Sequence, residues 1–205
     1  MTDERDPTEE QIREACDARD FERAATLTVE RYGAELLGFL VAQLRDADAA
    51  GEVFQQWSET FWRTLPNFEW RCSVRTWAYT LARRTAGHYR KRERRHDAGQ
   101  PLTQLSRLSV AVERVRTATL AYRRTDVKDR FQALREQLAE EDQTVLVLRV
   151  DRGLSWLELA QIMLGEETAP SEEQLKTEAA RLRKRFQHAK ERLRQLAEEA
   201  GLLES

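Results

Sequence analysis

The segment that decides the fold is 68-FEWRCSVRTWAYTLARRTAGHYRKRERR-95. From Val74 onward, apolar and small side chains recur at the i, i+3, i+4 and i+7 spacing of a helix with one buried face. The residues predicted to be buried are Val74, Trp77, Ala78, Leu81, Ala82, Thr85 and Tyr89. The residues predicted to lie on the opposite face are Thr76, Tyr79, Thr80, Arg83, Gly87, Arg90 and Lys91. A polar and basic face of this kind can follow a phosphate backbone.

The segment just before this helix combines two aromatic side chains with a cation. Phe68, Trp70 and Arg71 lie close together in the sequence, a composition typical of loops that stack on unpaired bases. Ser73 is placed to cap the helix. Glycine in mid-helix costs roughly 1 kcal/mol relative to alanine. At Gly87 we therefore expect either ordinary close helix packing or the approach of another molecule.

Composition limits the class of protein. The chain has 205 residues, 34% of them charged, and alternating strand patterns are almost absent, so we expect soluble helical domains. No window approaches the roughly eighteen uninterrupted apolar residues of a membrane span, and the acidic start is unlike a signal peptide. We therefore expect a cytoplasmic protein without membrane contact.

The sequence contains no motif for catalysis or metal binding. The 2 cysteines are isolated from each other and the 3 histidines show no metal-ligand spacing. No nucleophile and base pair and no glycine-rich phosphate loop is found. We expect free thiols, no metal, no cofactor and no enzymatic activity.

Charge is segregated along the chain, although the formal net charge is only −2. Residues 1–30 carry an excess of Asp and Glu, whereas residues 83–95 and 181–194 are dense in Arg and Lys. A basic run is commonly just a solvated helix face. Two such runs on amphipathic helices, with aromatic neighbours, favour nucleic-acid binding.

These patterns predict an all-α protein with two small helical domains joined by a linker. The acidic segment 1–20 is expected to be partly disordered, with a short helix starting at Pro7. The predicted boundaries are 21–96 for the first domain, 97–126 for a linker with at most a short helix at 110–122, and 127–205 for the second domain with a C-terminal helical extension. The other helical segments predicted in the first domain are Phe21–Arg45, as one helix or a helix pair, and Glu52–Leu65.

The second domain has the pattern of a helix-turn-helix. Predicted helices cover 127–139 and 142–152, the latter ended by a left-handed Gly153. Capping boxes at Ser155 and Ser171 start two further helices, the second of which runs to about Ala200. Its predicted inner seam is Leu175, Ala179, Leu182, Phe186, Ala189, Leu193 and Leu196, and its outer face is Thr177, Ala180, Arg181, Lys184 and His188.

Three segments resemble the extracytoplasmic-function (ECF) sigma factors of the sigma-70 family. The run 74-VRTWAYTLARRTAGHYRKRERR-95 resembles their downstream-promoter segment, although Arg84 and His88 replace the usual Asn and Asp. The helix Glu52–Leu65 resembles the segment that docks on core polymerase, with Gly51 in place of an acid. The runs 146-LVLRVDRGLSWLELA-160 and 174-QLKTEAARLRKRF-186 resemble their upstream-promoter helix-turn-helix.

The resemblance implies an alternative bacterial sigma factor that binds core RNA polymerase and directs promoter recognition, melting and transcription initiation at a stress or signal regulon. It makes 21–96 sigma region two and 127–205 sigma region four. The residues implied to bind polymerase are Asp48, Glu52, Gln55, Gln56 and Glu59. Those implied to bind downstream promoter DNA are Asn67, Phe68, Trp70, Arg71, Arg75, Thr76, Tyr79, Arg83, Arg84, His88, Arg90 and Lys91. Those implied to bind upstream promoter DNA are Gln174, Lys176, Thr177, Ala180, Arg181, Lys184 and Arg185.

The sequence leaves regulation open. The docking helix has fewer acids than is usual in the family, and phosphorylation of Ser58, Thr60 or Thr64 would add a charge of about −1.5 to −2 there. The alternative is that these are ordinary hydroxyls on a helix surface. An anti-sigma factor, a Ser/Thr kinase, the acidic start and the C-terminal extension are all candidate regulators. If the acidic start shields a basic helix, deleting residues 1–20 raises DNA affinity at low salt.

The alternative function is a helix-turn-helix repressor or activator that acts without polymerase. Such a protein would bind duplex DNA alone and would have no use for an aromatic loop before a basic helix. A helical scaffold that pairs with acidic partners is a third possibility, and it would ignore promoter DNA even with polymerase present.

Overall fold

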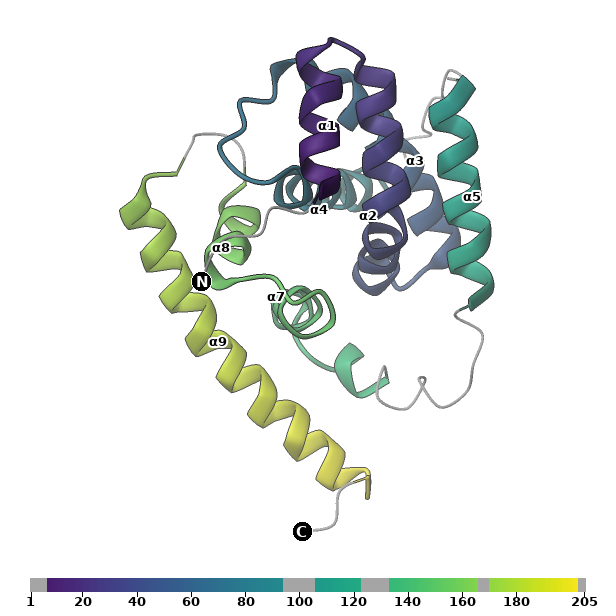
Figure 1. The fold of residues 1–205 in the computed structure, drawn as a ribbon. Coiled ribbons are helices and arrows are strands. Elements are labelled where there is room, and N and C mark those ends of the chain that lie inside the picture. The colour runs from purple at the N-terminus through teal and green to yellow at the C-terminus, as the bar shows by residue number, and fades with distance from the viewer. Residues whose placement is uncertain (1–6, 94–105, 123–132, 166–169, 203–205) are drawn as a thin grey trace. The chain divides into compact units, whose positions relative to one another are not determined.

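The computed structural model describes residues 7–93, 106–122, 133–165 and 170–202. The chain in these ranges consists of helices and connecting turns without any strand, and the prediction of an all-α fold is confirmed (Figure 1). The helices divide into two compact units, Met1–Ala121 and Tyr122–Ser205. Each unit buries its own set of apolar side chains.

The first unit is a bundle of helices that buries a cluster of aromatic side chains. Its elements are α1 (Pro7–Asp17), α2 (Phe21–Leu44), α3 (Ala47–Thr64), the short 3-10 turn η1 (Leu65–Asn67), α4 (Val74–Glu93) and α5 (Ser106–Tyr122). Helices α2, α3 and α4 pack on one another, and α1 packs on α2. Figure 1 shows α1 and α2 side by side with α4 running across them. Helix α3 starts five residues before the predicted Glu52 because the Asp46 carboxylate accepts hydrogen bonds from the amides of Asp48 (2.8 Å) and Ala49 (3.1 Å).

The first half of α4 is buried on more sides than its spacing predicts. The indole Nε1 of Trp57 on α3 donates to the carbonyl of Ala78 (3.0 Å), and on another side the rings of Phe39 and Tyr79 meet edge-on with centroids 5.4 Å apart. Because α2 and α3 both pack on these turns, the predicted exposed face is wrong over this half of the helix. The buried residues that were assigned to it are Thr76, Tyr79 and Thr80.

Helix α1 begins at Pro7, where the sequence predicts a short helix, and it is packed more firmly than the expectation of a partly disordered segment implied. Ile12 is 0% exposed and Ala15 is 2% exposed, so α1 contributes to the core of the first unit. These two residues form a narrow apolar stripe at i and i+3 within an otherwise acidic segment. The acidic composition of the segment favoured a prediction of partial disorder, so the packing of this stripe was not predicted. Residues 1–6 lie outside the described ranges.

Helix α5 corrects the expectation of a linker over 97–126. It is a helix of 17 residues that belongs to the first unit, with Leu108, Ala111 and Val112 buried. Two glycines lie beneath it. A Cβ built at Gly33 would lie 3.1 Å from Val115 Cγ2, so the absence of a side chain there makes room for α5. A Cβ built at Gly51 would lie 3.2 Å from Nε of the flexible Arg116 side chain.

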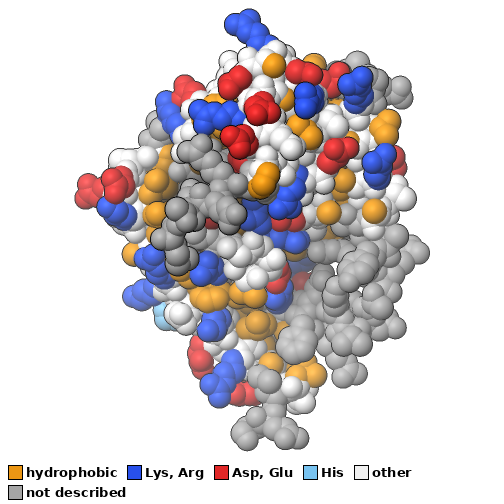
Figure 2. Space-filling view, in the orientation of Figure 1, with side chains coloured by type: hydrophobic (Ala, Val, Ile, Leu, Met, Phe, Trp, Pro, Cys, Tyr) orange, Lys and Arg blue, Asp and Glu red, His pale blue; other side chains and the backbone are white. Residues whose placement is uncertain are grey.

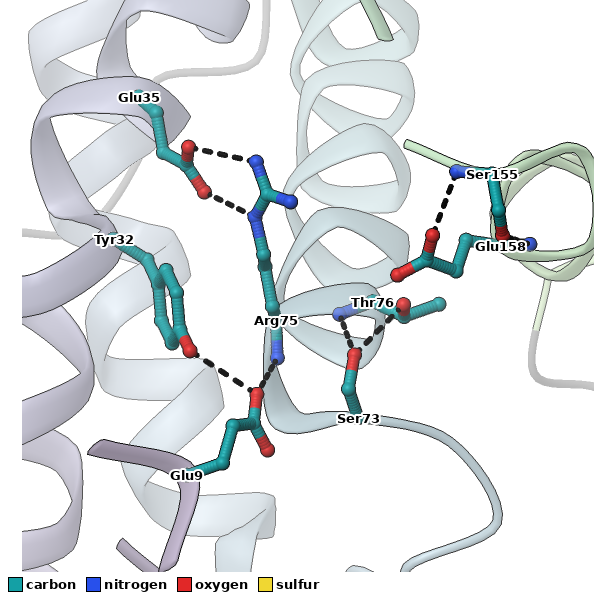
Figure 3. A network of polar contacts seen from close by, with 8 residues as sticks. All are labelled: Glu9, Tyr32, Glu35, Ser73, Arg75, Thr76, Ser155 and Glu158. Carbon is teal, nitrogen blue, oxygen red and sulfur yellow. Dashed lines mark hydrogen bonds and ion pairs between the residues drawn. The ribbon is translucent and has the colours of Figure 1, made fainter. Parts of the chain in front are cut away.

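The second unit contains α7 (Glu140–Leu146), one π-helical turn η2 (Val147–Asp151), α8 (Trp156–Leu164) and α9 (Glu172–Glu199). Both predicted capping boxes are present, and Gly153 is left-handed with φ +68°. Figure 3 shows the Ser155 amide donating to the Glu158 carboxylate (2.7 Å). Residues 127–132 of one predicted helix lie outside the described ranges.

The end of α9 packs inside the second unit. Leu196 and Ala197 are buried in a cluster with Leu134, Leu138 and Leu146, and the partly buried Leu193 and Leu202 pack against it. The C-terminal extension therefore stabilises this unit by burying apolar surface.

Candidate nucleic-acid interface

The aromatic loop (residues 67–73) connects η1, whose last residue is Asn67, to α4. Phe68 stacks on Trp77 of α4 with ring centroids 4.4 Å apart and an interplanar angle of 17°, and it also contacts Trp70 at 4.9 Å. Both loop aromatics are half-buried rather than exposed, whereas Asn67 and Arg71 are exposed. Arg71 forms an ion pair with Glu69. The loop thus offers a preformed aromatic stack with polar residues at its edge.

Trp70 has a left-handed backbone with φ +57°. For a residue other than glycine this conformation costs about 1–2 kcal/mol. The guanidinium carbon of Arg13 on α1 lies 5.1 Å from the centroid of the Trp70 ring, which is a cation–π geometry. Contacts from outside the loop therefore help to hold this conformation.

The second half of α4 carries an exposed polar strip, here called the α4 strip (Arg84, Gly87, His88 and Lys91). Arg84, His88 and Lys91 are exposed, and a Cβ built at Gly87 would meet no atom within 4 Å. The described residues therefore do not support close helix packing as the reason for this glycine. The strip lies on one face, at the i, i+3, i+4 and i+7 spacing.

Three residues predicted to bind downstream DNA are engaged inside the first unit. The Arg75 guanidinium forms a bidentate ion pair with Glu35, with Nε–Oε1 at 2.7 Å and Nη2–Oε2 at 2.9 Å. Thr76 is 1% exposed, and its amide donates to Ser73 Oγ (3.0 Å), which confirms the predicted cap. Tyr79 is 0% exposed. The prediction that Thr76 and Tyr79 contact DNA is wrong, since their side chains are enclosed by α4 and its neighbours.

The predicted polymerase-binding residues share one face of α3. Asp48, Glu52 and Gln55 are exposed, and Gln56 and Glu59 are half-buried. Glu52 Oε1 accepts hydrogen bonds from Gln56 Nε2 (2.8 Å) and from Arg92 Nη2 of α4 (3.0 Å). Burial raises the pKa of Glu59 above its usual range, against the opposing effect of Arg63. Part of the acidity of this face is thus neutralised within the unit.

The candidate phosphorylation sites are poorly accessible on α3. Ser58 is 3% exposed, and its hydroxyl donates to the carbonyl of Gln55 (2.8 Å). Its assignment to the helix surface is wrong, because it lies on the same side as the buried Gly51 and Phe54. The half-buried Thr60 and Thr64 donate to the carbonyls four residues earlier, at 2.9 and 2.7 Å.

The outer face of α9 (Thr177, Ala180, Arg181, Lys184 and His188) is exposed as predicted, and so is the neighbouring Lys176. Gln174, also predicted to bind DNA, is exposed and serves in the capping box through its Oε1, which accepts from the Ser171 amide (2.7 Å). Figure 2 shows Lys and Arg side chains gathered along the position of α9, with acidic side chains at its start. A capped helix with a basic exposed side is suited to a DNA major groove.

Two arginines of α9 are held by acids of α7, which the sequence did not indicate. Arg181 Nη2 lies 2.5 Å from Glu141 and 2.7 Å from Glu178. The hydrogen bond to Glu178, and after it the one to Glu141, raises the pKa of Arg181 above its usual range. Arg185 pairs with Asp142 (2.7 Å) and Glu141 (3.0 Å). Both arginines join α9 to α7, so any DNA contact by their side chains would compete with these pairs.

Among the described residues, no group of three or more His, Cys, Asp or Glu side chains is arranged to hold a metal ion. No helix within the described ranges is both long enough and apolar enough to cross a membrane.

Together these features define a helical protein with two surfaces suited to nucleic acid, one in each unit. The family model for sigma-70 region 2 matches residues 28–96, which span most of α2, α3, the aromatic loop and α4. The RNA polymerase sigma-H factor of Pseudomonas aeruginosa is 30% identical over 149 residues, which cover 71% of this chain and 77% of that protein. The chain belongs to the sigma-70 family of RNA polymerase sigma factors.

Proposed function

We propose that the chain is an ECF-type sigma factor that binds core RNA polymerase in the cytoplasm and directs promoter recognition and melting without enzymatic activity of its own. The observation that carries the proposal is the aromatic loop joined directly to α4, whose second half carries the α4 strip, within the region matched by the family model. A repressor that reads only duplex DNA has no use for a preformed aromatic stack beside a basic helix.

Helix α3 is the proposed polymerase contact. Its exposed face holds Asp48, Glu52 and Gln55, and a basic partner surface would be attracted to it. The test replaces Gln55 by lysine and compares it with Gln11→Lys, the same change on the exposed side of α1. We expect Gln55→Lys to weaken binding to core polymerase and Gln11→Lys to leave it unchanged. Equal binding by the two variants would exclude this face.

The proposed downstream DNA contact combines the aromatic loop with the α4 strip. Unpaired bases of the melted strand would stack on the loop aromatics, since base–aromatic stacking contributes about 1–3 kcal/mol per base. The proposed residues are Asn67, Phe68, Trp70, Arg71, Arg83, Arg84, Gly87, His88, Arg90 and Lys91. Arg90 also donates to the carbonyl of Gln43 on α2, which fixes part of its side chain. Fork-junction DNA should therefore bind the holoenzyme more tightly than the same sequence as duplex.

The proposed upstream contact is the outer face of α9 in the major groove. Lys176 lies 2.5 Å from Glu172 one turn earlier, an exposed pair that DNA phosphate can replace at little cost. Gln174, Thr177, Ala180 and Lys184 complete the surface. Arg181 and Arg185 would contact DNA only by leaving their partners on α7.

Control by an anti-sigma factor or by a Ser/Thr kinase remains part of the proposal. A kinase would act at Thr60 or Thr64, because Ser58 is buried. The test measures core-polymerase binding by unmodified protein and by Thr60→Glu and Thr64→Glu variants. Gain of binding only in the acidic variants supports phosphorylation, and full binding by the unmodified chain supports an anti-sigma partner.

A further inference from the structure

The start of α4 is capped by a carboxylate from a distant helix. Glu9 on α1 accepts hydrogen bonds from the amides of Val74 (Oε2, 2.9 Å) and Arg75 (Oε1, 3.0 Å). These amides are among the first of α4, which have no partner within the helix itself. The negative charge also lies at the positive end of the α4 helix dipole. Ser73 caps the next amide, so both local and remote groups fix this helix start.

The Glu9 carboxylate is itself held in place. Its Oε1 accepts a hydrogen bond from the Tyr32 hydroxyl of α2 (3.2 Å). The side chain of Arg75, the residue whose amide Glu9 accepts, extends to Glu35 on α2. Figure 3 shows this network, with Glu9 beneath Tyr32 and Arg75 between Glu9 and Glu35. Helices α1, α2 and α4 therefore meet at the residue where the aromatic loop ends.

One turn along α1, a second side chain reaches the same loop. Arg13 lies at i+4 from Glu9, on the same side of α1, and its guanidinium stands over the Trp70 ring. Trp70 is the loop residue with the left-handed backbone. Helix α1 thus holds the loop at its middle, through Arg13, and at its junction with α4, through Glu9. Residues 7–17 lie outside the range matched by the family model.

We propose that α1 positions the aromatic loop for capture of unpaired DNA bases, with Glu9 and Arg13 as the positioning residues. The inference rests on the proposed function of the loop. If the acidic start shielded a basic helix, its removal would raise DNA affinity. The present proposal predicts the opposite effect: loss of the α1 contacts should weaken binding of melted DNA, because capture depends on a preformed loop geometry.

The first experiment measures amide hydrogen exchange in the full chain. Glu9→Gln removes the charge and one of the two accepting oxygens, while Glu10→Gln makes the same change at the neighbouring exposed position of α1. We expect faster exchange at Val74, Arg75 and the aromatic loop in Glu9→Gln alone. Identical exchange in the two variants would overturn the proposal.

The second experiment measures binding of a fork-junction DNA, built on a promoter selected by wild-type holoenzyme, to polymerase reconstituted with each variant. Glu9→Gln should weaken fork binding by about 2- to 30-fold, the range for loss of a helix cap. Arg13→Lys keeps the charge but removes the stacked guanidinium, and it should also weaken fork binding. This variant provides the test if Glu9→Gln folds poorly. Glu10→Gln should bind as wild type.

A double-mutant cycle separates positioning from general destabilisation. An abasic site at the captured base should weaken wild-type binding, and Glu9→Gln should add little to that loss because both changes remove the same interaction. Equal losses by Glu9→Gln on fork and on fully paired probes would overturn the proposal, as would wild-type affinity of both Glu9→Gln and Arg13→Lys. Failure of the wild-type chain to bind core polymerase or the fork would instead refute the proposed function itself.

Discussion

Gly87 is the residue of α4 whose replacement best separates stability from DNA binding. It lies within the helix, and a Cβ there would meet no atom within 4 Å. Gly87→Ala should raise the free energy of unfolding by about 0.5–1 kcal/mol, because alanine loses less backbone entropy in a helix. If DNA backbone approaches at this point, the same variant should bind fork DNA more weakly. Chemical denaturation and fork-DNA binding of one protein sample check both effects. A variant in which stability and fork affinity both rise, or both fall, would contradict the prediction.

Cys16 should be an unreactive thiol in the folded chain. Burial, aided by the charge of Asp17, raises its pKa to about 11 from the ordinary value of 9.0. At pH 8 the reactive thiolate is therefore about 100-fold rarer than in the unfolded chain. Alkylation of the Cys16 peptide, followed by mass spectrometry, should be slower by roughly that factor in native protein than in denaturant. Equal rates in the two states would show that α1 is not packed as described.

At the residue scale, local interactions were predictable and remote ones were not. The caps at Ser73, Ser155 and Ser171 follow from residues within three positions in the sequence. Glu9 caps amides that lie 65 and 66 residues away, and no local pattern indicates that pairing. The pairing of Arg181 with Glu141, which is 40 residues distant, was missed for the same reason.

At the scale of elements, α5 gives a prediction about the two glycines beneath it. Gly51→Ala would meet the end of the flexible Arg116 side chain, which can move, so we expect a gain in stability of about 0.5–1 kcal/mol. Gly33→Ala would meet the branched Val115 and the Phe54 ring at 3.1–3.3 Å, and we expect it to loosen α5. Hydrogen exchange over residues 106–122 checks the difference. Faster exchange in Gly51→Ala than in Gly33→Ala would contradict it.

A second prediction at this scale concerns the two sides of α9. Lys184 lies on the outer face, whereas Lys190 is rotated away from it and lies over the Phe186 ring. Lys184→Gln should reduce the slope of log affinity against log salt by about 1 for upstream duplex DNA, as expected for loss of one phosphate contact. Lys190→Gln should leave the slope unchanged. Salt titrations of holoenzyme binding provide the measurement. Equal slopes in both variants would show that Lys184 on the outer face of α9 does not contact a DNA phosphate.

Helix existence was more predictable than helix burial. The apolar seams of α4 and α9 follow from 3.6-residue periodicity, and they are found where the sequence predicts them. The burial of Thr76 and Thr80 was missed because small hydroxyl side chains bond to their own helix and can be enclosed, as Thr80 does with the Thr76 carbonyl (3.0 Å). Helices α1 and α5 were underestimated because only a few apolar residues carry their packing.

At the scale of the whole molecule, DNA affinity depends more on where the charged side chains lie along the chain than on the net charge. A net charge of −2 gives no general attraction to nucleic acid, so DNA affinity depends on the α4 strip and the outer face of α9. Both surfaces are small, and a protein with two modest contacts gains affinity when they engage one DNA together. Binding to a promoter through polymerase, which provides that joint engagement in the proposed function, is therefore expected to exceed binding of the isolated chain.

The measurement that tests this account most directly is transcription with purified core polymerase on a library of DNA templates, with and without the chain. We predict that adding the chain, or its acidic Thr60→Glu and Thr64→Glu forms, produces transcripts from discrete start sites that core polymerase alone does not use. Tight binding of the isolated chain to duplex DNA, with no association with core polymerase in any form and no new start sites, would contradict the account.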